Sequence, residues 1–396
     1  MKILFLGYVV SPSEADKYKG ASVAGNKMQW NIISHLSRMG NDITCVSLTP
    51  HASFPKENYL VQEHNEDMLV NNCKTINPAY VNIPVLKQIM QIAGVMRNAY
   101  KYLKKNPEAI VLCYNLSVHI GIPFMFLKRK FVQTQFACIV ADLPLKDDFS
   151  RRGLYAIFSK IGEELWRRNL KKCNKYIVLN ENAVRQYIGN KPYIVVEGGV
   201  DEEDICDNYE IYPDEIHDKK KHIIFAGALV EYNGILELID AMNCVNDKNI
   251  VLDIYGSGIL EDEVKKRIIT KDNVVFHGRV SNKQVINAQR NAWLIIATRH
   301  PEDPITKVTF PSKTFEILLS ETPFLSTKLD CYLKEYSKYM FFIENNSSVG
   351  IAEAINKLSV SDYAELKQKA IEARKFVLRE KLWNVQVKKI KEFIAK

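Results

Sequence analysis

The chain has 396 residues, of which 47% are apolar and 25% are charged. This composition is ordinary for a globular protein, and the length exceeds a single core, so two domains are expected. No apolar run reaches the roughly 18 residues of a transmembrane helix, and the opening MKILFLGYVV is too short for a secretory signal and predicts a buried strand. The eight scattered cysteines include no C-x-x-C pair, which argues against a zinc site or a disulfide framework and for a cytoplasmic protein.

The net charge of +8 is concentrated in one segment. Residues 97–175 hold 16 Lys or Arg against 6 Asp or Glu, a surplus of 10. A basic surface suits nucleic acid, anionic lipid headgroups or phosphorylated substrates. Because no nucleic-acid motif accompanies it, we expect no nucleic-acid partner and a peripheral association with an anionic membrane surface. The basic clusters are Lys128–Lys130 after the apolar run 124–127, which suits the membrane or the core, Arg151–Arg152, and Arg167–Arg168 beside Trp166.

Apolar runs alternate with helical patterns along the whole chain. One set of predicted strands is Ile3–Leu6, Ile43–Ser47, Ile110–Tyr114, Phe131–Val140, Lys175–Leu179 and Tyr193–Val196. A second set is His222–Phe225, Asn249–Tyr255, Val274–Phe276, Trp293–Ala297, Pro323–Ser326 and Met340–Ile343. Helices are predicted over Ala24–Arg38, Pro84–Lys105, Gly153–Lys171, Leu236–Met242, Asp262–Ile269, Asn282–Gln289 and Val349–Leu358. The predicted fold class is therefore α/β, with two Rossmann-like domains built on parallel sheets.

The domain boundary is predicted in a charged stretch that contains Pro213. Residues 201–221 have the polar composition of a linker. Residues 1–200 then form an N-terminal domain, and residues 222–375 form a second domain. The last stretch, 376–396, is a helical pattern that contains Trp383.

Three positions in the first domain are candidate site residues. Gly20 precedes the helix predicted from Ala24, where small residues let the backbone approach a phosphate or sugar, although a plain loop explains it equally well. Asp142 ends an apolar run, where a polar side chain would point into an interdomain cleft; a helix cap or loop carboxylate is the alternative. Asn115, at the end of the preceding strand, is a neighbouring candidate.

Glycines mark the turns of the second domain. The stretch FAGALVEYNG, residues 225–234, is a strand and turn that contain Gly227 and Gly234. Gly256 follows the next strand, but position 261 is Glu rather than a third glycine, which argues against dinucleotide-binding spacing. A third turn, FHGRV, carries Arg279. Each turn has a plain structural explanation as a tight connection between a strand and a helix.

The stretch FPSKTFEILLSETPFL, residues 310–325, is the most informative of the chain. It follows the apolar run Trp293–Ala297 and the polar segment Arg299–Thr309, which is predicted to be irregular. The pattern predicts a strand, a loop and a short helix that Ser312 caps and Pro323 ends.

Two charged residues of this stretch are expected on one face of that helix. Lys313 and Glu316 are three residues apart, close to the positive end of the helix. A cation, free backbone N–H groups and a carboxylate would then converge at the carboxyl end of a strand. This combination suits the phosphates and the ribose of a nucleotide diphosphate.

The sequence Pro-Ser-Lys, Phe-Glu, Pro at 311–313, 315–316 and 323 resembles the donor-site signature of retaining, family-4-type bacterial glycosyltransferases with the GT-B fold. The resemblance extends weakly over nearly the whole chain. It implies two Rossmann-like domains that face a central cleft, a nucleotide-sugar donor such as a UDP or GDP sugar, and neither a metal nor another cofactor. The implied acceptor is a glycan or lipid-linked glycan in cell-surface polysaccharide synthesis, at the inner face of the cell membrane.

The resemblance also implies roles for individual residues. Glu316 would bind the ribose, and Lys313 with the amides around Phe315–Ile317 would bind the departing diphosphate. Gly20 would let the first domain close on the donor, and Asp142 and Asn115 would orient the sugar or acceptor. The remaining donor-binding candidates are Gly227, Asn233, Gly256, Arg279 and Arg299. The last helix, 376–396, would pack back onto the first domain.

Three positions depart from the family pattern. Ala228 replaces the usual arginine, Asn233 the usual lysine, and Val308 the first glutamate. Arg299 and Lys313 are candidates to supply the missing positive charge. The departures favour a second interpretation, a non-catalytic GT-B subunit that supports a partner transferase. A GT-B epimerase that acts on a nucleotide sugar is a weaker alternative, and a Rossmann oxidoreductase is weaker still because the third glycine is missing.

Overall fold

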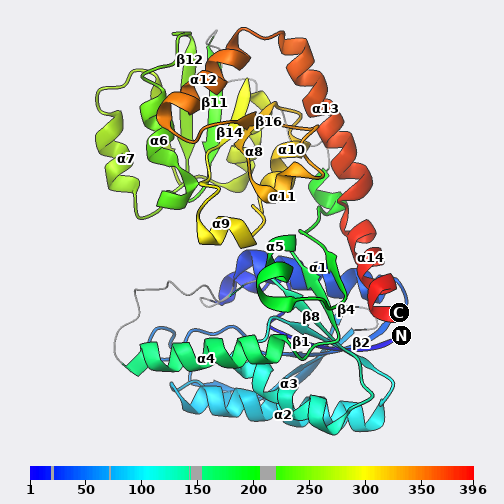
Figure 1. Cartoon of the computed structure of the whole chain (residues 1–396). Coiled ribbons are helices and arrows are strands. Elements are labelled where there is room, and N and C mark those ends of the chain that lie inside the picture. Colours follow the sequence, from blue (N-terminus) through cyan, green and yellow to red (C-terminus); the bar gives the residue numbers. More distant parts are fainter. Residues whose placement is uncertain (19–21, 71–72, 142, 144–153, 206–219) are drawn as a thin grey trace. The chain divides into compact units, whose positions relative to one another are not determined.

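The computed structural model describes residues 1–18, 22–70, 73–141, 143, 154–205 and 220–396. The chain divides into two compact units. Unit 1 comprises Met1–Gly199 and Trp383–Lys396, and unit 2 comprises Val200–Leu382. Each unit is a sheet with helices packed against it, so the fold class is α/β (Figure 1).

Unit 1 is built on a sheet with the strand order β10-β9-β8-β7-β1-β2-β5-β4 in the described ranges. Neighbouring strands are parallel, except that β4 runs antiparallel to β5 at one edge. These strands are β1 Lys2–Gly7, β2 Asp42–Ser47, β4 Asn65–Val70, β5 Cys73–Asn77, β7 Ile110–Tyr114, β8 Phe136–Val140, β9 Lys175–Val178 and β10 Tyr193–Val195. A separate antiparallel pair consists of β3 Val61–Gln62 and β6 Tyr80–Val81.

The helices of unit 1 bury one side against this sheet. They are η1 Ala15–Lys17, α1 Val23–Arg38, α2 Leu86–Lys105, α3 Val118–Lys130, α4 Leu154–Leu170, α5 Glu181–Ala183, η2 Val184–Ile188 and α14 Trp383–Ala395. The C-terminal helix α14 belongs here because Trp383, Val387 and Ile390 recur at helical spacing and share one apolar cluster with Ile32 and Leu36 of α1.

Unit 2 is built on a fully parallel sheet with the order β13-β12-β11-β14-β15-β16 in the part of the chain that is described. The strands are β11 Lys221–Ala226, β12 Ile250–Tyr255, β13 Val274–Gly278, β14 Leu294–Ala297, β15 Phe324–Thr327 and β16 Phe341–Ile343. The chain moves outward from β11 to β13 and then returns to the other side of β11 with β14. The point where the strand order reverses is therefore between β11 and β14.

The helices of unit 2 connect these strands. They are η3 Glu202–Ile205, η4 Glu231–Asn233, α6 Ile235–Ala241, α7 Glu261–Ile268, α8 Asn282–Asn291, α9 Pro304–Val308, α10 Thr314–Leu319, α11 Asp330–Leu333, α12 Ser348–Ser359 and α13 Tyr363–Glu380. Apolar residues of β11, β12 and β14 pack with those of α6 and α12 in one buried cluster, which includes Ile223, Leu252 and Ile355.

Several predictions about individual elements were wrong. The strand predicted over 131–140 is only β8, because residues 131–135 form a turn in which the Thr134 amide donates to the Phe131 carbonyl. The segment 299–309, predicted to be irregular, contains α9, whose start is capped by the Asp303 side chain accepting from the backbone N–H groups of Ile305 and Thr306. The pattern 376–396 is not one helix, because α13 runs to Glu380 within unit 2 and α14 begins at Trp383.

Further features of the sequence concern a membrane span, the apolar run 124–127, the cysteines and the linker. In the described ranges, no helix is both long and apolar enough to cross a bilayer. Phe124 and Leu127 of the run 124–127 are core residues, because both are fully buried. Five described cysteines are buried: Cys45, Cys73, Cys113, Cys138 and Cys173. Most of the predicted linker, residues 206–219, lies outside the described residues.

Candidate functional site

A cavity of about 240 Å³ opens at the carboxyl ends of β11, β14 and β15 in unit 2. This is where the strand order of the sheet reverses, and open parallel sheets bind their ligands at such a point. Five predicted donor-binding residues line the cavity: Gly227, Asn233, Arg299, Lys313 and Ile317.

The cavity suits a negatively charged, polar ligand. Arg299 and Lys313 contribute two cations, whereas its described lining contains no Asp or Glu. Ser326, which also lines the cavity, is 1% exposed, and its Oγ has no hydrogen-bond partner among the described residues. Since buried polar atoms are normally hydrogen-bonded, this hydroxyl is available to a ligand or to water.

Arg299 is held in place by three contacts. Its Nε donates to Asn233 Oδ1 at 3.3 Å, and its Nη1 donates to Thr309 Oγ1 at 3.3 Å. The guanidinium also lies over the ring of Tyr232, 5.1 Å from the ring centre. Asn233 in turn donates through Nδ2 to the Ala228 carbonyl at 2.8 Å. Asn233, which stands where the family has lysine, therefore positions a cation instead of supplying one.

Glycines allow the turns beside the cavity to pack closely. Gly234 has φ of 63°, and a Cβ there would collide with the Thr298 carbonyl oxygen. Thr298 Oγ1 lies 2.9 Å and 3.0 Å from the carbonyl oxygens of Asn233 and Gly234. Gly256 has φ of 144°, and a Cβ there would collide with the carbonyl oxygen of Gly227. Gly256 thus supports the turn that carries Gly227 and is not itself part of the cavity lining.

Helix α10 places Lys313 at the cavity but differs in detail from the prediction. Ser312 does not cap the helix, because Lys313 is the N-cap residue and no side chain caps that end. Thr314 Oγ1 instead donates to the Pro311 carbonyl at 2.7 Å. The Ile317 amide donates to the Lys313 carbonyl at 3.0 Å, so it is already used within the chain and cannot serve a diphosphate as predicted.

Phe315 anchors α10 in the core of unit 2. Its side chain is 5% exposed, and its ring stacks on that of Phe310 with the ring centres 5.3 Å apart. The ring of Tyr336 lies 6.4 Å away on the same cluster. The side chain therefore packs and does not line the cavity, and the role of the Phe315 backbone amide at the diphosphate stays a prediction.

Glu316 lies beside the cavity lining and contacts a different helix. Asn282, the first residue of α8, donates through Nδ2 to Glu316 Oε2 at 3.3 Å. The start of α8 is itself fixed, because Ser281 and Gln284 form a capping box. Arg279 is an exposed residue of the loop between β13 and α8. The structure therefore brings Glu316 to the segment that follows Arg279.

A buried carboxylate in strand β12 was not among the residues predicted from the sequence. Asp253 of β12 is 5% exposed, with Oδ2 2.6 Å from His222 Nδ1 and Oδ1 2.7 Å from His277 Nε2. The His277 ring stacks on Tyr255, with ring centres 4.4 Å apart. These contacts join β11, β12 and β13 ahead of the turn at Gly278. An aspartate within the apolar run VLDIY was the signal that could have found it.

Two of the three candidates in unit 1, Gly20 and Asp142, lie outside the described residues. Asn115 is described, and its φ of 51° is in the left-handed region, which asparagine tolerates better than most residues. Its Oδ1 accepts from the Ala141 amide at 2.9 Å, and its own amide donates to the Ile139 carbonyl at 2.8 Å. Asn115 thus links the end of β7 to the chain that leaves β8, immediately before position 142.

Residues 210–376 match the family model of glycosyl transferases group 1. No curated protein sequence matches the chain. Among solved structures, Anabaena HepE in complex with UDP is similar over 100% of both chains, with a TM-score of 0.70 and 14% identity. Sucrose-phosphate synthase from Thermosynechococcus elongatus is similar over 100% of this chain and 98% of its own, with a TM-score of 0.68 and 14% identity. The chain has the GT-B fold.

Another GT-B structure, a trehalose-6-phosphate protein from E. coli bound with UDP-2-fluoro glucose, covers 100% of this chain and 99% of its own. Its TM-score is 0.64 at 10% identity. At such identities the structural likeness establishes the fold alone. The family match supports a glycosyltransferase, and it covers the unit that carries the cavity with Arg299 and Lys313.

Proposed function

We propose that this GT-B protein is a glycosyltransferase that uses a nucleotide-sugar donor bound in unit 2. The observation that carries the proposal is the pair of cations, Arg299 and Lys313, at a cavity whose described lining has no carboxylate, at the switch point of a parallel sheet. A nucleotide sugar brings a diphosphate, which needs cationic and hydrogen-bond donor groups of this kind.

Each site residue has a role in this proposal. Arg299 and Lys313 bind the diphosphate and stabilise its negative charge as the bond to the sugar breaks, so no metal is required. Glu316, oriented by Asn282, accepts hydrogen bonds from the ribose hydroxyls. Asp142 and Gly20 keep their predicted roles at the sugar and the diphosphate. Asn115 holds the chain before Asp142 and acts as a positioning residue.

The finer details of the reaction also belong to the proposal. A UDP sugar is favoured as donor because two of the similar GT-B structures hold UDP or UDP-2-fluoro glucose. We expect retention of configuration at the transferred sugar. The acceptor is a glycan or lipid-linked glycan of cell-surface polysaccharide synthesis, and the enzyme acts in the cytoplasm at the inner face of the membrane.

A non-catalytic GT-B subunit is the second candidate, favoured by the replacement of the family's arginine and lysine by Ala228 and Asn233. Two measurements on the full chain separate the two. Calorimetry with UDP, GDP, ADP and dTDP tests the site, and release of nucleotide from the matching sugar donor tests the chemistry. Binding with slow donor hydrolysis supports the transferase. Binding without turnover of any donor, or no binding of any nucleotide, supports the subunit and contradicts the transferase.

A further inference from the structure

Helix α2 of unit 1 buries one side and leaves apolar groups exposed on the other. Its buried residues recur every four positions: Lys87, Gln91, Val95, Ala99 and Leu103. The apolar residues at its start face outward, with Val85 68%, Leu86 43% and Ile89 59% exposed. Single exposed apolar side chains are common, but three within five residues form an apolar patch whose exposure to water is unfavourable.

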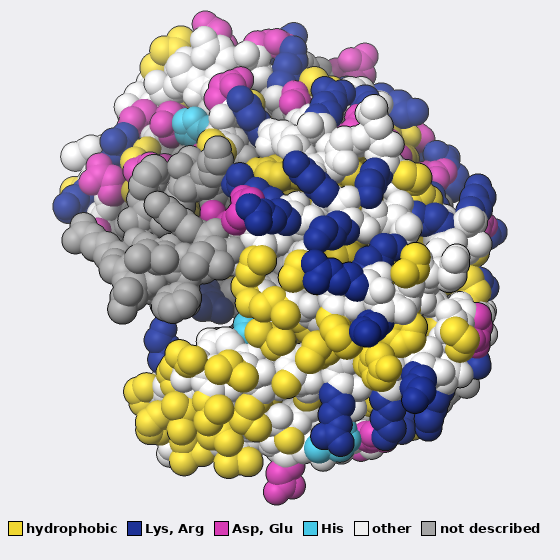
Figure 2. Space-filling view, turned by 60° about the horizontal axis from the view of Figure 1, so that its bottom comes forward, with side chains coloured by type: hydrophobic (Ala, Val, Ile, Leu, Met, Phe, Trp, Pro, Cys, Tyr) yellow, Lys and Arg dark blue, Asp and Glu magenta, His cyan; other side chains and the backbone are white. Residues whose placement is uncertain are grey.

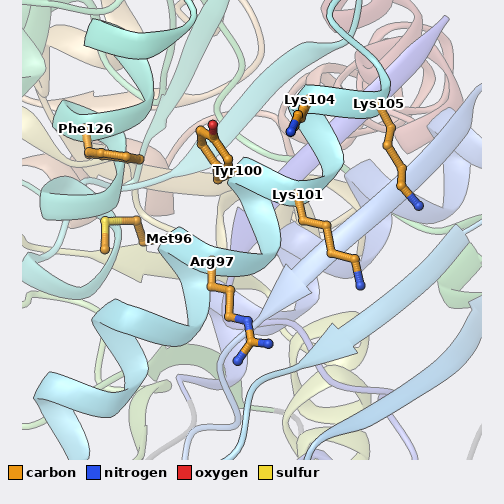
Figure 3. A pocket seen from close by; sticks show the side chains of 7 residues that line it. All are labelled: Met96, Arg97, Tyr100, Lys101, Lys104, Lys105 and Phe126. Atoms are coloured by element: carbon orange, nitrogen blue, oxygen red, sulfur yellow. The ribbon is translucent and has the colours of Figure 1, made fainter.

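A groove of about 640 Å³ continues this patch between α2 and α3. Met96 and Tyr100 from α2 and Phe126 from α3 line it with apolar groups, and Figure 3 shows them gathered on one side of α2. The centre of the Tyr100 ring lies 6.0 Å from that of Phe126, so side chains of both helices form the floor of the groove. The other lining residues are cations of α2, namely Arg97, Lys101, Lys104 and Lys105.

The positive charge of this face has little compensation nearby. Residues 68–141 contain nine Lys or Arg and a single Asp or Glu, Glu108, which pairs with Lys2 at 2.9 Å. In the described ranges, no acidic side chain forms an ion pair with any of the four groove cations. Figure 2 shows hydrophobic and Lys or Arg side chains together on one face of the molecule. The cluster Lys128–Lys130 contributes less available positive charge, because Lys128 donates to Asn174 Oδ1 at 2.6 Å.

We propose that the outer face of α2 and its groove with α3 dock onto an anionic phospholipid surface. Leu86, Ile89 and Tyr100 would enter the boundary between headgroups and acyl chains. The four cations, on long aliphatic stems, would reach the lipid phosphates. This charge complementarity favours an anionic lipid surface over a second copy of the chain, because a copy docked across a two-fold axis would bring the same four cations again and no acidic residue from the described lining. The inference rests on the membrane location in the proposed function and names the surface that makes the contact, but it does not depend on the donor site, which lies in unit 2.

The test measures cosedimentation of the full chain with phosphatidylcholine vesicles, with and without phosphatidylglycerol. One variant removes the four groove cations: Arg97→Gln, Lys101→Gln, Lys104→Gln and Lys105→Gln. A matched control removes four exposed lysines elsewhere: Lys248→Gln, Lys266→Gln, Lys357→Gln and Lys388→Gln. A third variant, Leu86→Gln with Ile89→Gln, removes the apolar contact. Far-UV circular dichroism and the melting temperature establish that each variant is folded.

The wild type and the control variant should bind anionic vesicles and lose binding as salt is added. The groove variant should bind about 600-fold more weakly, because each of the four basic residues near an anionic surface contributes roughly a factor of five. The apolar variant should bind several-fold more weakly at every salt concentration. Equal loss in the groove and control variants would overturn the inference, because only net charge would then matter. Equal binding to neutral vesicles, or a wild-type dimer that the apolar variant abolishes, would also overturn it.

Discussion

Arg299 Nε donates a hydrogen bond to Asn233 Oδ1 across 3.3 Å and thereby ties the loop after β14 to the turn after β11. The cation at the cavity, Arg299, and the residue that orients it, Asn233, thus come from different segments of unit 2. A cation that comes from the β14 side can therefore compensate for the alanine at position 228, and this contact helps to keep it at the cavity.

We expect Arg299→Ala to weaken UDP binding about tenfold or more, because a charge-assisted hydrogen bond contributes about 1.5–3 kcal/mol. Uridine binding should change little, since uridine has no phosphate. Asn233→Ala should give a smaller loss, because the guanidinium remains but is less well oriented. Calorimetry with both ligands measures these effects, with Lys357→Ala, an exposed residue of α12, as the control. Wild-type UDP affinity in Arg299→Ala would remove this residue from the donor site.

Glu316→Ala should also lower UDP affinity about tenfold, through the lost hydrogen bonds to the ribose. Asn282→Ala should lower it less, because Asn282 acts through Glu316. The loss caused by Glu316→Ala should shrink for a nucleotide that lacks the ribose hydroxyls, and this comparison separates ribose binding from a general disturbance of α10. Equal losses for the two ligands would indicate a structural role only.

Apart from β5, Cys73–Asn77, the sequence pattern predicted the interior strands well, for a physical reason. A parallel strand covered on both faces is a nearly continuous apolar run, as Leu294–Ala297 is. The edge strand β4, Asn65–Val70, has no such run because most of its residues are exposed, and it was missed. The site was predicted only in outline. Lys313 at the cavity follows from local sequence, but the contact of Glu316 with Asn282, 34 positions earlier, depends on how α10 packs against α8.

Asn115 and position 142 should respond differently to substitution. Asn115→Ala removes the bond to the Ala141 amide and places alanine at a φ of 51°, so we expect a lower melting temperature together with slower turnover. Asp142→Asn preserves shape, so we expect slower turnover at an unchanged melting temperature and nucleotide affinity. Melting curves, calorimetry and transfer rates on the same preparations measure this. Normal transfer by a stable Asp142→Asn protein would exclude the residue from the reaction.

His119 at the start of α3 should make unit 1 sensitive to acid. Burial lowers its pKa from 6.5 to about 4, with the Lys87 charge adding to the effect, and Tyr8 Oη lies 3.4 Å from its Nδ1. Between pH 6.5 and 4 the unfolded chain binds a proton that the folded chain excludes. The free energy of unfolding is therefore largest above pH 6.5 and falls as the pH drops toward 4, by up to about 3 kcal/mol.

Urea unfolding of the wild type and of His119→Asn at pH 7 and pH 4.5 tests this expectation. The variant should lose less stability between the two pH values than the wild type does. His64→Asn is the control, because His64 is an exposed partner of Glu66. If the wild type and His119→Asn lose the same stability, the titration of His119 does not contribute.

The two crossings between the units lie side by side, since the Val200 amide donates to the Lys381 carbonyl at 2.9 Å and Val200 bridges to Leu382. Unit 2 is therefore an insertion within unit 1, with its first and last residues adjacent. Such a segment can be excised as one continuous polypeptide, 200–382, and assayed for nucleotide binding alone. Unit 1 is instead two pieces, and a short bridge from Gly199 to Trp383 would be needed to keep α14 on α1 once the insertion is removed.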